Sequence, residues 1–598
     1  MDLLRSPVGR ALAVGLAVWA VAGESRAADP GPSEAGEGQA REAPTAETAA
    51  TLESRLLDQL AGGTLTDELI ALFPKYALAR ARERFVPDVA PEDFWFWLEH
   101  HRQRDIREGL LVMLHPDYDP HLMKCLVRLK RRFDRDVDSY PQLSLALTAV
   151  YGRAGEGDVR DPELADVTEG LDEPSLEESF AYYLKHESAM RLSLKERPWP
   201  ILAYVVNNDA SITERLWALD RYRKMRPHEW CLMAGNVHHD KRRSKIKDRE
   251  YTLQNIYVCG GSYHDQAYFG SRVLKSFGIP GIISKPDRHW SQCHAVIYVG
   301  PARKGTDLLY DRKVCTRCYT AFCPLRRCDV NDADIRLLVA AMACSYEKYL
   351  DARIACHLYE MLPPDRRAQA IGLLEGALKR NSCCKRAWDL LVEATVEGLL
   401  QPDERQRVFD LLLQAYALHP GLSFDVLTRV FHGLAESSRA ESAWEIDVNL
   451  FAAQRAVDLY AKLDHAKLVT EMRYELGQYL EFLDRPEGAM KLYMAAAKHI
   501  AEYVDPDHWL LKTVDAALAL MGDEKYLRVR IHFLADMVQE VPMYAYYWDK
   551  ESDRKCRAYK HVVKAYIEAL REAGLAAEAM KWETSLQQKV AKPKPIRP

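Results

Sequence analysis

The chain has 598 residues, of which 48% are hydrophobic and 28% charged, and its formal net charge is −5. This apolar fraction excludes disorder throughout the chain, and the length predicts roughly four units on the usual prior of about 150 residues per domain. The small net charge gives no general attraction to nucleic acid or to anionic membranes, so we expect neither as a partner.

The N-terminus has the pattern of a secretory signal peptide. Arg5 and Arg10 flank the start of an apolar run over 11–23, and small residues at 25 and 27 precede a cleavage point after Ala27. This pattern predicts that residues 1–27 are removed on export, the alternative being an uncleaved membrane anchor. We therefore expect a periplasmic or extracellular protein with no membrane span after signal cleavage. Disulfides are permitted in those compartments.

The remaining chain divides by composition and periodicity. Residues 28–50 are rich in Ala, Glu, Gly and Pro without apolar periodicity, which predicts a disordered linker. Helical periodicity predicts a mostly helical region over 51–230, and it returns over 346–590. Between these, 231–345 mixes helical and strand-like patterns. Residues 591–598 are predicted to form a frayed tail.

Three local patterns stand out in the N-terminal helical region. The aromatic residues at 94–97 have helical spacing and are predicted to lie in the core. Residues 198–206 are uniformly apolar, and the segment 198–209 is interpreted as buried and extended. Ser211 and Glu214 form a capping signature that predicts a helix through Tyr222.

The central region predicts one helix followed by strands. The helix is expected from Ser262 to Phe277, ending at Gly278-Ile279-Pro280. Strand-like runs follow at 294–299 and 307–310, with glycines between them. A helix packed on antiparallel strands predicts an α+β fold class for this domain, flanked by mostly α-helical regions.

The C-terminal region carries small residues at recurring positions. Ala370, Leu374 and Ala377 precede Trp388 and Leu391. A second unit repeats the pattern, with Leu476, Gly477 and Leu480 before Ala489, Tyr493 and Ala496, and a weaker unit surrounds Ala415 and Pro420. These spacings resemble the tetratricopeptide repeat, the alternative being an irregular helical bundle. Repeat stacks form concave binding surfaces, so a protein or peptide partner is expected here.

The stretch over 257–280 carries a second resemblance. In chain order, this stretch has a Cys, a predicted helix and Gly-Ile-Pro. The pair His294-Ala295 and then Asp311 follow it. This order resembles the transglutaminase-like superfamily, which has a papain-type cysteine fold. The resemblance implies a thiol nucleophile at the helix start, His294 as the base and Asp311 as the residue that orients it. Such a site performs acyl transfer on peptide or amide bonds.

The register of the nucleophile departs from the family pattern. Family members have Gly-x-Cys-x-x-x-Ala where this chain has Gly261, Tyr263 and Ala267, so Tyr263 occupies the nucleophile position. A tyrosine hydroxyl, with a pKa near 10, is a poor acyl-transfer nucleophile. The sequence thus predicts a catalytically degenerate domain that acts in binding or scaffolding. The alternative is an active peptidase, amidase or transamidase that uses Cys259, His294 and Asp311. The nearby segment 238–240 is interpreted as an exposed loop.

The chain has 13 cysteines, of which four are closely spaced at Cys315, Cys318, Cys323 and Cys328. This spacing suits a structural zinc site, two disulfides or unpaired thiols, and the sequence leaves these alternatives open. The adjacent residues Cys383 and Cys384 are not expected to pair with each other. No nucleotide-binding or calcium-binding pattern is present, so no cofactor other than zinc is considered.

Overall fold

The computed structural model describes residues 47–85, 89–100, 104–113, 120–154, 172–240, 242, 245–285, 295–302, 305–310, 320–401, 466–501, 507–541 and 557–591, with isolated positions between 404 and 457. The predicted signal peptide, the repeat unit around Ala415 and the C-terminal tail lie outside the described residues. Among the described residues, no helix has the length and apolar character needed to cross a membrane.

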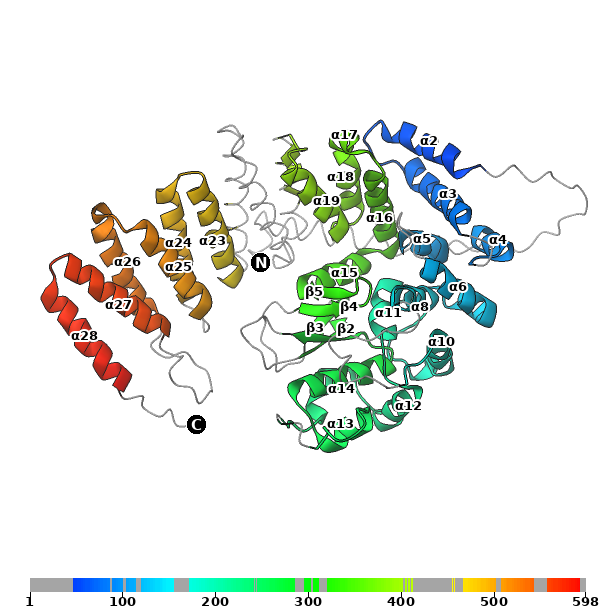
Figure 1. Cartoon of the computed structure of the whole chain (residues 1–598), viewed down its shortest axis with the longest axis horizontal. Coiled ribbons are helices and arrows are strands. Elements are labelled where there is room, and N and C mark those ends of the chain that lie inside the picture. The colour runs from blue at the N-terminus through cyan, green and yellow to red at the C-terminus, as the bar shows by residue number, and fades with distance from the viewer. Residues whose placement is uncertain are drawn as a thin grey trace, which may run out of the picture. The chain divides into compact units, whose positions relative to one another are not determined.

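Helices make up most of the described chain before the sheet (Figure 1). They are α2 (Ala49–Leu60), α3 (Asp67–Arg84), α4 (Glu92–His100), α5 (Arg104–Met113), α6 (Pro120–Phe133), α7 (Arg135–Ser139), α8 (Pro141–Ala154), α10 (Leu176–Lys185), α11 (Trp199–Val206), α12 (Ile212–Arg221), α13 (Leu253–Cys259) and α14 (Tyr263–Ser276). Short 3-10 turns lie at Glu187–Ala189, Pro227–Leu232 and Ala234–Asn236. The aromatic prediction holds for Phe94 and Trp95, which are buried, whereas Phe96 is 65% exposed.

Two predicted helices are confirmed, and both begin at the residue that their caps indicate. α12 starts after Ser211, whose side chain and that of Glu214 form a reciprocal capping box. α14 starts after Ser262 with the same arrangement on Asp265. Gly278 has a φ of 71°, a left-handed conformation that glycine adopts without steric cost, and it ends α14 as predicted.

The segment over 198–209 contains a helix, so its interpretation as an extended segment is wrong. α11 begins after Pro198 and carries Pro200 in its first turn, where a missing N–H costs nothing. All eight of its residues are buried. A helix that is covered on every side shows no apolar periodicity, which is why the sequence pattern resembled a buried strand.

The described strands form one antiparallel sheet of order β3-β2-β1-β4-β5. Their bounds are β1 (Gly281–Lys285), β2 (Ala295–Ala302), β3 (Gly305–Tyr310), β4 (Thr320–Cys323) and β5 (Cys328–Asn331). β2 and β3 are the two strands that the sequence predicted, and Ile297 pairs with Tyr310 in their register. α14 packs on β1 and β2, whereas α15 contacts both outer strands, β3 and β5. The sheet thus lies between α14 and α15 (Figure 1).

The remaining described helices follow the sheet. They are α15 (Asp332–Cys344), α16 (Tyr346–Glu360), α17 (Pro364–Arg367), α18 (Ile371–Arg380), α19 (Lys385–Val396), α23 (Ala466–Phe482), α24 (Pro486–Ala501), α25 (Asp507–Leu520), α26 (Leu527–Glu540), α27 (Arg557–Glu572) and α28 (Ala576–Ala591), with 3-10 turns at Ala368–Ala370 and Glu524–Tyr526. Successive members such as α23 and α24 pack on each other. A Cβ atom placed on Gly477 would lie 2.4 Å from the Tyr493 ring, so the glycine permits this close approach.

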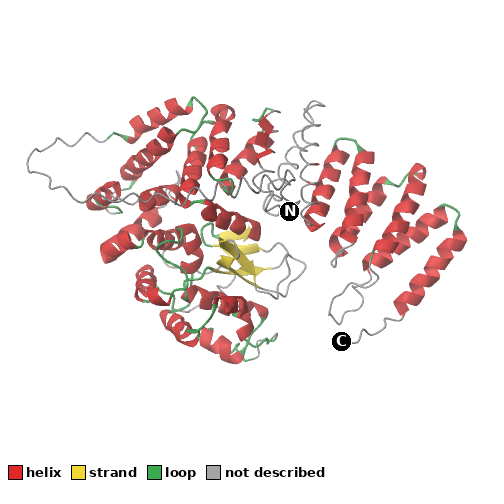
Figure 2. Ribbon diagram, turned by 180° about the vertical axis from the view of Figure 1, so that it is seen from behind, coloured by secondary structure: helices red, strands yellow, loops and turns green. Residues whose placement is uncertain are grey.

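The predicted α+β fold class is wrong for this chain. Helices dominate the described residues, and the strands are five short segments of four to eight residues (Figure 2). The hydrophobic clusters around α3, α16 and α18, and around α6, α8 and α11, are built largely from helix-on-helix packing. A papain-type domain depends on a substantial sheet to carry its site, so the assignment to the transglutaminase-like superfamily is wrong for the same reason.

Candidate functional site

The residues singled out by the nucleophile register lie at the junction of α13 and α14. Tyr263 is the first residue of α14 and is 40% exposed. Cys259 is the last residue of α13, and its side chain is buried in a hydrophobic cluster with Ile256 and Leu274. A thiol enclosed by apolar side chains is poorly placed to act as a displaced nucleophile. The predicted base His294 and its partner Asp311 lie outside the described residues.

The N-terminus of α14 is occupied by a carboxylate of the chain itself. Asp265 accepts hydrogen bonds from the Ser262 N–H at 2.8 Å and from the Tyr251 hydroxyl at 2.7 Å. This side chain is fully buried. Its negative charge meets the positive end of the helix dipole, which is the electrostatic feature that would otherwise stabilise a thiolate or an oxyanion.

The segment 238–240, which was predicted to be an exposed loop, packs against this junction. His239 forms an isolated β-bridge with Gly261, and its imidazole stacks on Tyr263 with 4.1 Å between ring centroids. The N–H of Asp240 donates to the carbonyl of Gly261 at 2.7 Å. His239 and Tyr263 thus form a structural contact that holds the entry to α14.

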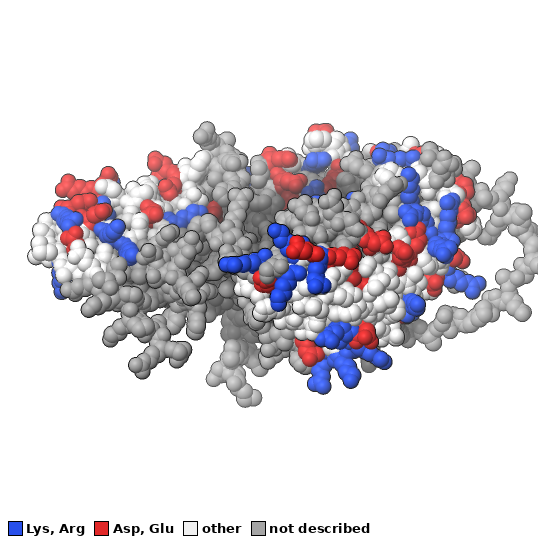
Figure 3. Space-filling view, turned by 60° about the horizontal axis from the view of Figure 1, so that its bottom comes forward, with Lys and Arg blue, Asp and Glu red and all other residues white. Residues whose placement is uncertain are grey.

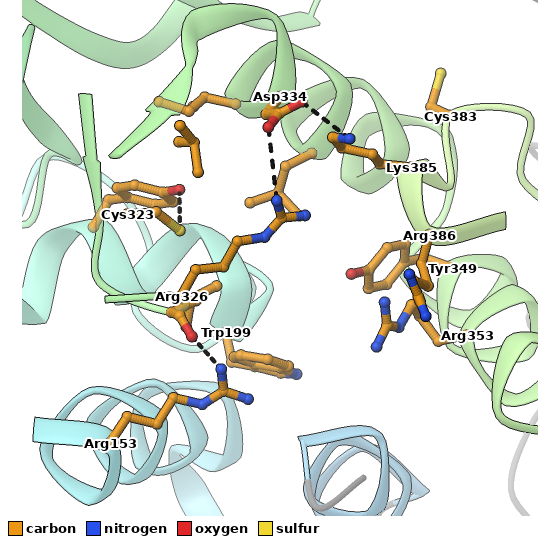
Figure 4. A pocket seen from close by; sticks show the side chains of 15 residues that line it. Arg153, Trp199, Cys323, Arg326, Asp334, Tyr349, Arg353, Cys383, Lys385 and Arg386 are labelled. Carbon is orange, nitrogen blue, oxygen red and sulfur yellow. Dashed lines mark hydrogen bonds and ion pairs between the residues drawn. The ribbon is translucent and has the colours of Figure 1, made fainter. Parts of the chain in front are cut away.

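A different site lies between the helices that flank the sheet. A pocket of about 160 Å³ is lined by side chains of α8, α11, the β4–β5 hairpin, α15, α16 and the start of α19 (Figure 4). Since one water requires roughly 10–15 Å³ of such volume, the pocket has room for on the order of ten waters or one small organic ligand. The residues of its wall are far apart in the sequence, the first being Arg153 and the last Arg386.

The lining of this pocket is strongly cationic. It contains one carboxylate, that of Asp334, and five basic side chains, namely Arg153, Arg326, Arg353, Lys385 and Arg386. Lys385 and Arg326 both face Asp334, at 3.5 Å and 3.7 Å (Figure 4). On the face of the molecule shown in Figure 3, by contrast, acidic and basic side chains are interspersed.

Carboxylates behind the wall pair with two of these cations. Lys385 contacts Asp389 at 2.8 Å. The Arg386 guanidinium binds Glu360 through two nitrogens and Glu393 through the third, at 3.3 Å. The guanidinium of Arg153 donates to the carbonyl of Leu325. The four acidic groups, Asp334, Asp389, Glu360 and Glu393, therefore leave the five basic side chains with an excess of one positive charge.

Two hydrogen-bond donors that belong to residues lining the pocket are unused within the described chain. Nε of Arg353 and Nε1 of Trp199 are both buried and have no hydrogen-bond partner. Trp199 is 6% exposed. Burial raises the pKa of Tyr349 to about 12, so its hydroxyl is protonated at neutral pH and can donate a hydrogen bond. Figure 4 shows Arg353 and Arg386 beside the Tyr349 ring. A wall of donors with excess positive charge suits an oxyanion.

The cysteine-rich segment is only partly described. Cys315 and Cys318 lie outside the described residues. Cys323 and Cys328 are opposite each other across the β4–β5 hairpin, and both are free thiols. Cys323 lines the pocket and accepts a hydrogen bond from the Tyr204 hydroxyl at 3.3 Å, whereas Cys328 is exposed. No group of metal-ligating side chains is assembled in the part of the chain that the structure describes.

The pocket could not be found from the sequence, because its residues form no motif. The basic pairs Arg326-Arg327 and Lys385-Arg386 were the available signals, and such pairs are usually solvent-exposed. No family model, curated protein or solved structure matches this chain. Neither the transglutaminase-like nor the tetratricopeptide-like assignment is therefore supported by a relative.

Proposed function

We propose that this chain is a binding protein that holds an oxyanion, a phosphate or carboxylate group of a small ligand, in the pocket between α11, α15, α16 and α19. The observation that carries this proposal is the lining of five basic side chains and one carboxylate, together with the unpartnered Nε of Arg353. A buried N–H donor without an acceptor is costly, and an oxyanion would supply an acceptor to the Nε of Arg353.

Inorganic phosphate and acetate are suitable probes, with glycerol as the uncharged control. We expect heat of binding with at least one anion in isothermal titration calorimetry and none with glycerol. Arg353→Met should weaken that binding about 10- to 100-fold, since a hydrogen bond to a charged group contributes about 1.5–3 kcal/mol.

The matched control is Arg128→Met. Arg128 is exposed and pairs with Glu177 at 2.8 Å, away from the pocket lining. Its removal should leave anion binding unchanged. Absence of binding by either anion to the wild-type chain, or equal loss in the two variants, would contradict the proposal.

A second proposal concerns the helix pairs α23–α28, where the sequence favoured a protein or peptide partner. Met580 of α28 is 67% exposed, and Leu575, which precedes this helix, is 44% exposed. Large apolar side chains exposed together are frequent at interaction sites. Peptides selected from a library on the whole chain should bind the wild type and fail to bind Met580→Lys. Binding that is insensitive to this substitution would remove the support for this surface. Export of the chain remains part of the proposal on the sequence pattern alone.

A further inference from the structure

We infer that Cys344 and Cys383 form a thiol–disulfide exchange site, which reacts with small disulfides of the glutathione class and closes to an internal Cys344–Cys383 disulfide. This inference does not depend on anion binding. Cys344 is the last residue of α15 and is exposed, whereas Cys383 lies in the turn between α18 and α19 and is 7% exposed. Both are free thiols, and they are in hydrogen-bond contact with each other.

The turn that carries Cys383 is held against the α15–α16 junction by a buried side chain. Asn381 is 1% exposed, and its amide donates to the carbonyls of Ala341 at 2.9 Å and Ser345 at 3.5 Å. Its side-chain oxygen accepts the N–H of Cys383 at 3.2 Å. Asn381 thus connects the backbone N–H of Cys383 to the carbonyls of Ala341 and Ser345, which lie before and after Cys344 in the chain. The turn that carries Cys383 is therefore held beside the end of α15, where Cys344 lies.

The two thiols have unequal acidity. The hydrogen bond donated by Cys383 lowers the pKa of Cys344 to about 7, and Lys348 acts in the same direction while burial opposes it. The same hydrogen bond, with burial, raises the pKa of Cys383, which remains the protonated donor. An exposed thiol with a pKa near ambient pH is well placed to attack a disulfide, and its buried neighbour is well placed to resolve the product.

The reaction proceeds in two balanced exchanges. The Cys344 thiolate attacks one sulfur of the small disulfide, so a mixed disulfide forms and one small thiolate leaves. Cys383 then gives up its proton and attacks the Cys344 sulfur, which forms the internal disulfide and releases the second small thiolate. The protein loses two protons and two electrons, and the external disulfide is reduced to two thiols.

A neighbouring pair provides an internal control. Cys356 and Cys384 are also in hydrogen-bond contact, but both are fully buried. A small disulfide in solution cannot reach them in the folded protein, so they should stay reduced. Cys384 is adjacent to Cys383 in sequence, and the comparison therefore separates accessibility from position along the chain.

The experiment uses the whole reduced chain, which is first incubated with oxidised glutathione. Free thiols are then blocked with N-ethylmaleimide, and the protein is digested with trypsin without reduction. We expect peptide 337–348 linked to peptide 381–385, with a mass two hydrogens below their sum once the N-ethylmaleimide on Cys384 is included. Peptide 354–366, which contains Cys356, should be recovered unlinked. Cys384→Ser should retain the linked species.

Single substitutions test the order of the steps. Cys383→Ser should accumulate a glutathione adduct on Cys344, because the resolving thiol is gone, while Cys344→Ser should form neither the adduct nor the linked peptides. Unchanged circular dichroism would show that both variants fold. The inference is overturned if the wild type yields no linked species, if peptide 354–366 is linked to a similar extent, or if linkage persists in Cys344→Ser.

Discussion

Replacing Arg272 by Met should destabilise the region around α14 by about 3–5 kcal/mol, because it leaves the carboxylate of Asp209 buried without the guanidinium that pairs with it. The two side chains are 4% and 2% exposed. Nε and Nη2 of Arg272 donate to the two oxygens of Asp209 at 2.5 Å and 2.9 Å. Denaturant unfolding and hydrogen exchange of residues 263–276 would measure the loss.

Two further variants make this prediction specific. Arg80→Met removes an exposed pair with Glu53 and should change stability by less than about 1 kcal/mol. The double variant Asp209→Leu/Arg272→Met removes both charges and should be more stable than Arg272→Met. A double variant no more stable than the single one would show that packing, not the unpaired charge, causes the loss.

The same pair predicts a dependence on pH. Burial acts to raise the pKa of Asp209, but Arg272 and Lys275 outweigh it, and the folded-state pKa lies below the ordinary value. The stabilisation is therefore fully present above the unfolded-state pKa of about 3.9 and is lost as the pH falls through the lower folded-state pKa. The wild type should lose stability more steeply in acid than the double variant.

Trp388→Ala should destabilise the α16–α18–α19 unit by about 3–5 kcal/mol, because it opens a cavity in a well-packed core. Trp388 is 1% exposed and belongs to the largest described hydrophobic cluster. Its indole N–H also donates to the carbonyl of Ser382 at 2.8 Å, next to the two cysteines of the turn. The change in the denaturant midpoint would measure the effect.

A graded series distinguishes volume from hydrogen bonding in this prediction. Trp388→Phe retains most of the apolar volume and loses the hydrogen bond, so its cost should be nearer 1–2 kcal/mol. Phe96→Ala removes an aromatic side chain that is 65% exposed and should change stability by at most about 0.5 kcal/mol. A cost for Trp388→Phe equal to that of Trp388→Ala would contradict the cavity argument.

Local signals at one end of each helix made α12 and α14 predictable. Ser211 with Glu214 satisfies the first N–H groups of α12 and is visible in the sequence, whereas α14 was predicted from the stop at Gly278. The reciprocal pair of Ser262 and Asp265 was found in the structure. α11 was not predictable because its burial on every side erases the periodicity by which helices are recognised. The apolar periodicity of a helix depends on one side being exposed and the other buried, so a helix buried on every side lacks it.

The family prediction was wrong, and the pocket was not predicted, for a related reason. A helix start, a Gly-Ile-Pro stop and a following strand are local features, and their order around Tyr263 carried the resemblance without determining the dominant helical packing. The pocket, in contrast, depends on tertiary placement. Arg153, Arg353 and Arg386 come from three different helices, and no spacing in the sequence relates them. A cluster of basic side chains from separate helices can be recognised only once the packing of those helices is known.

The contacts of α15 also bear on how this protein behaves at high concentration. An outer strand presents unpaired N–H and C=O groups to which a strand from another molecule can add, and this is a common route to aggregation. α15 contacts both β3 and β5, the two strands that end the sheet. One helix thus lies beside the strands that form both margins. Variants that loosen α15 should expose these margins and form intermolecular β-structure before the helical regions unfold.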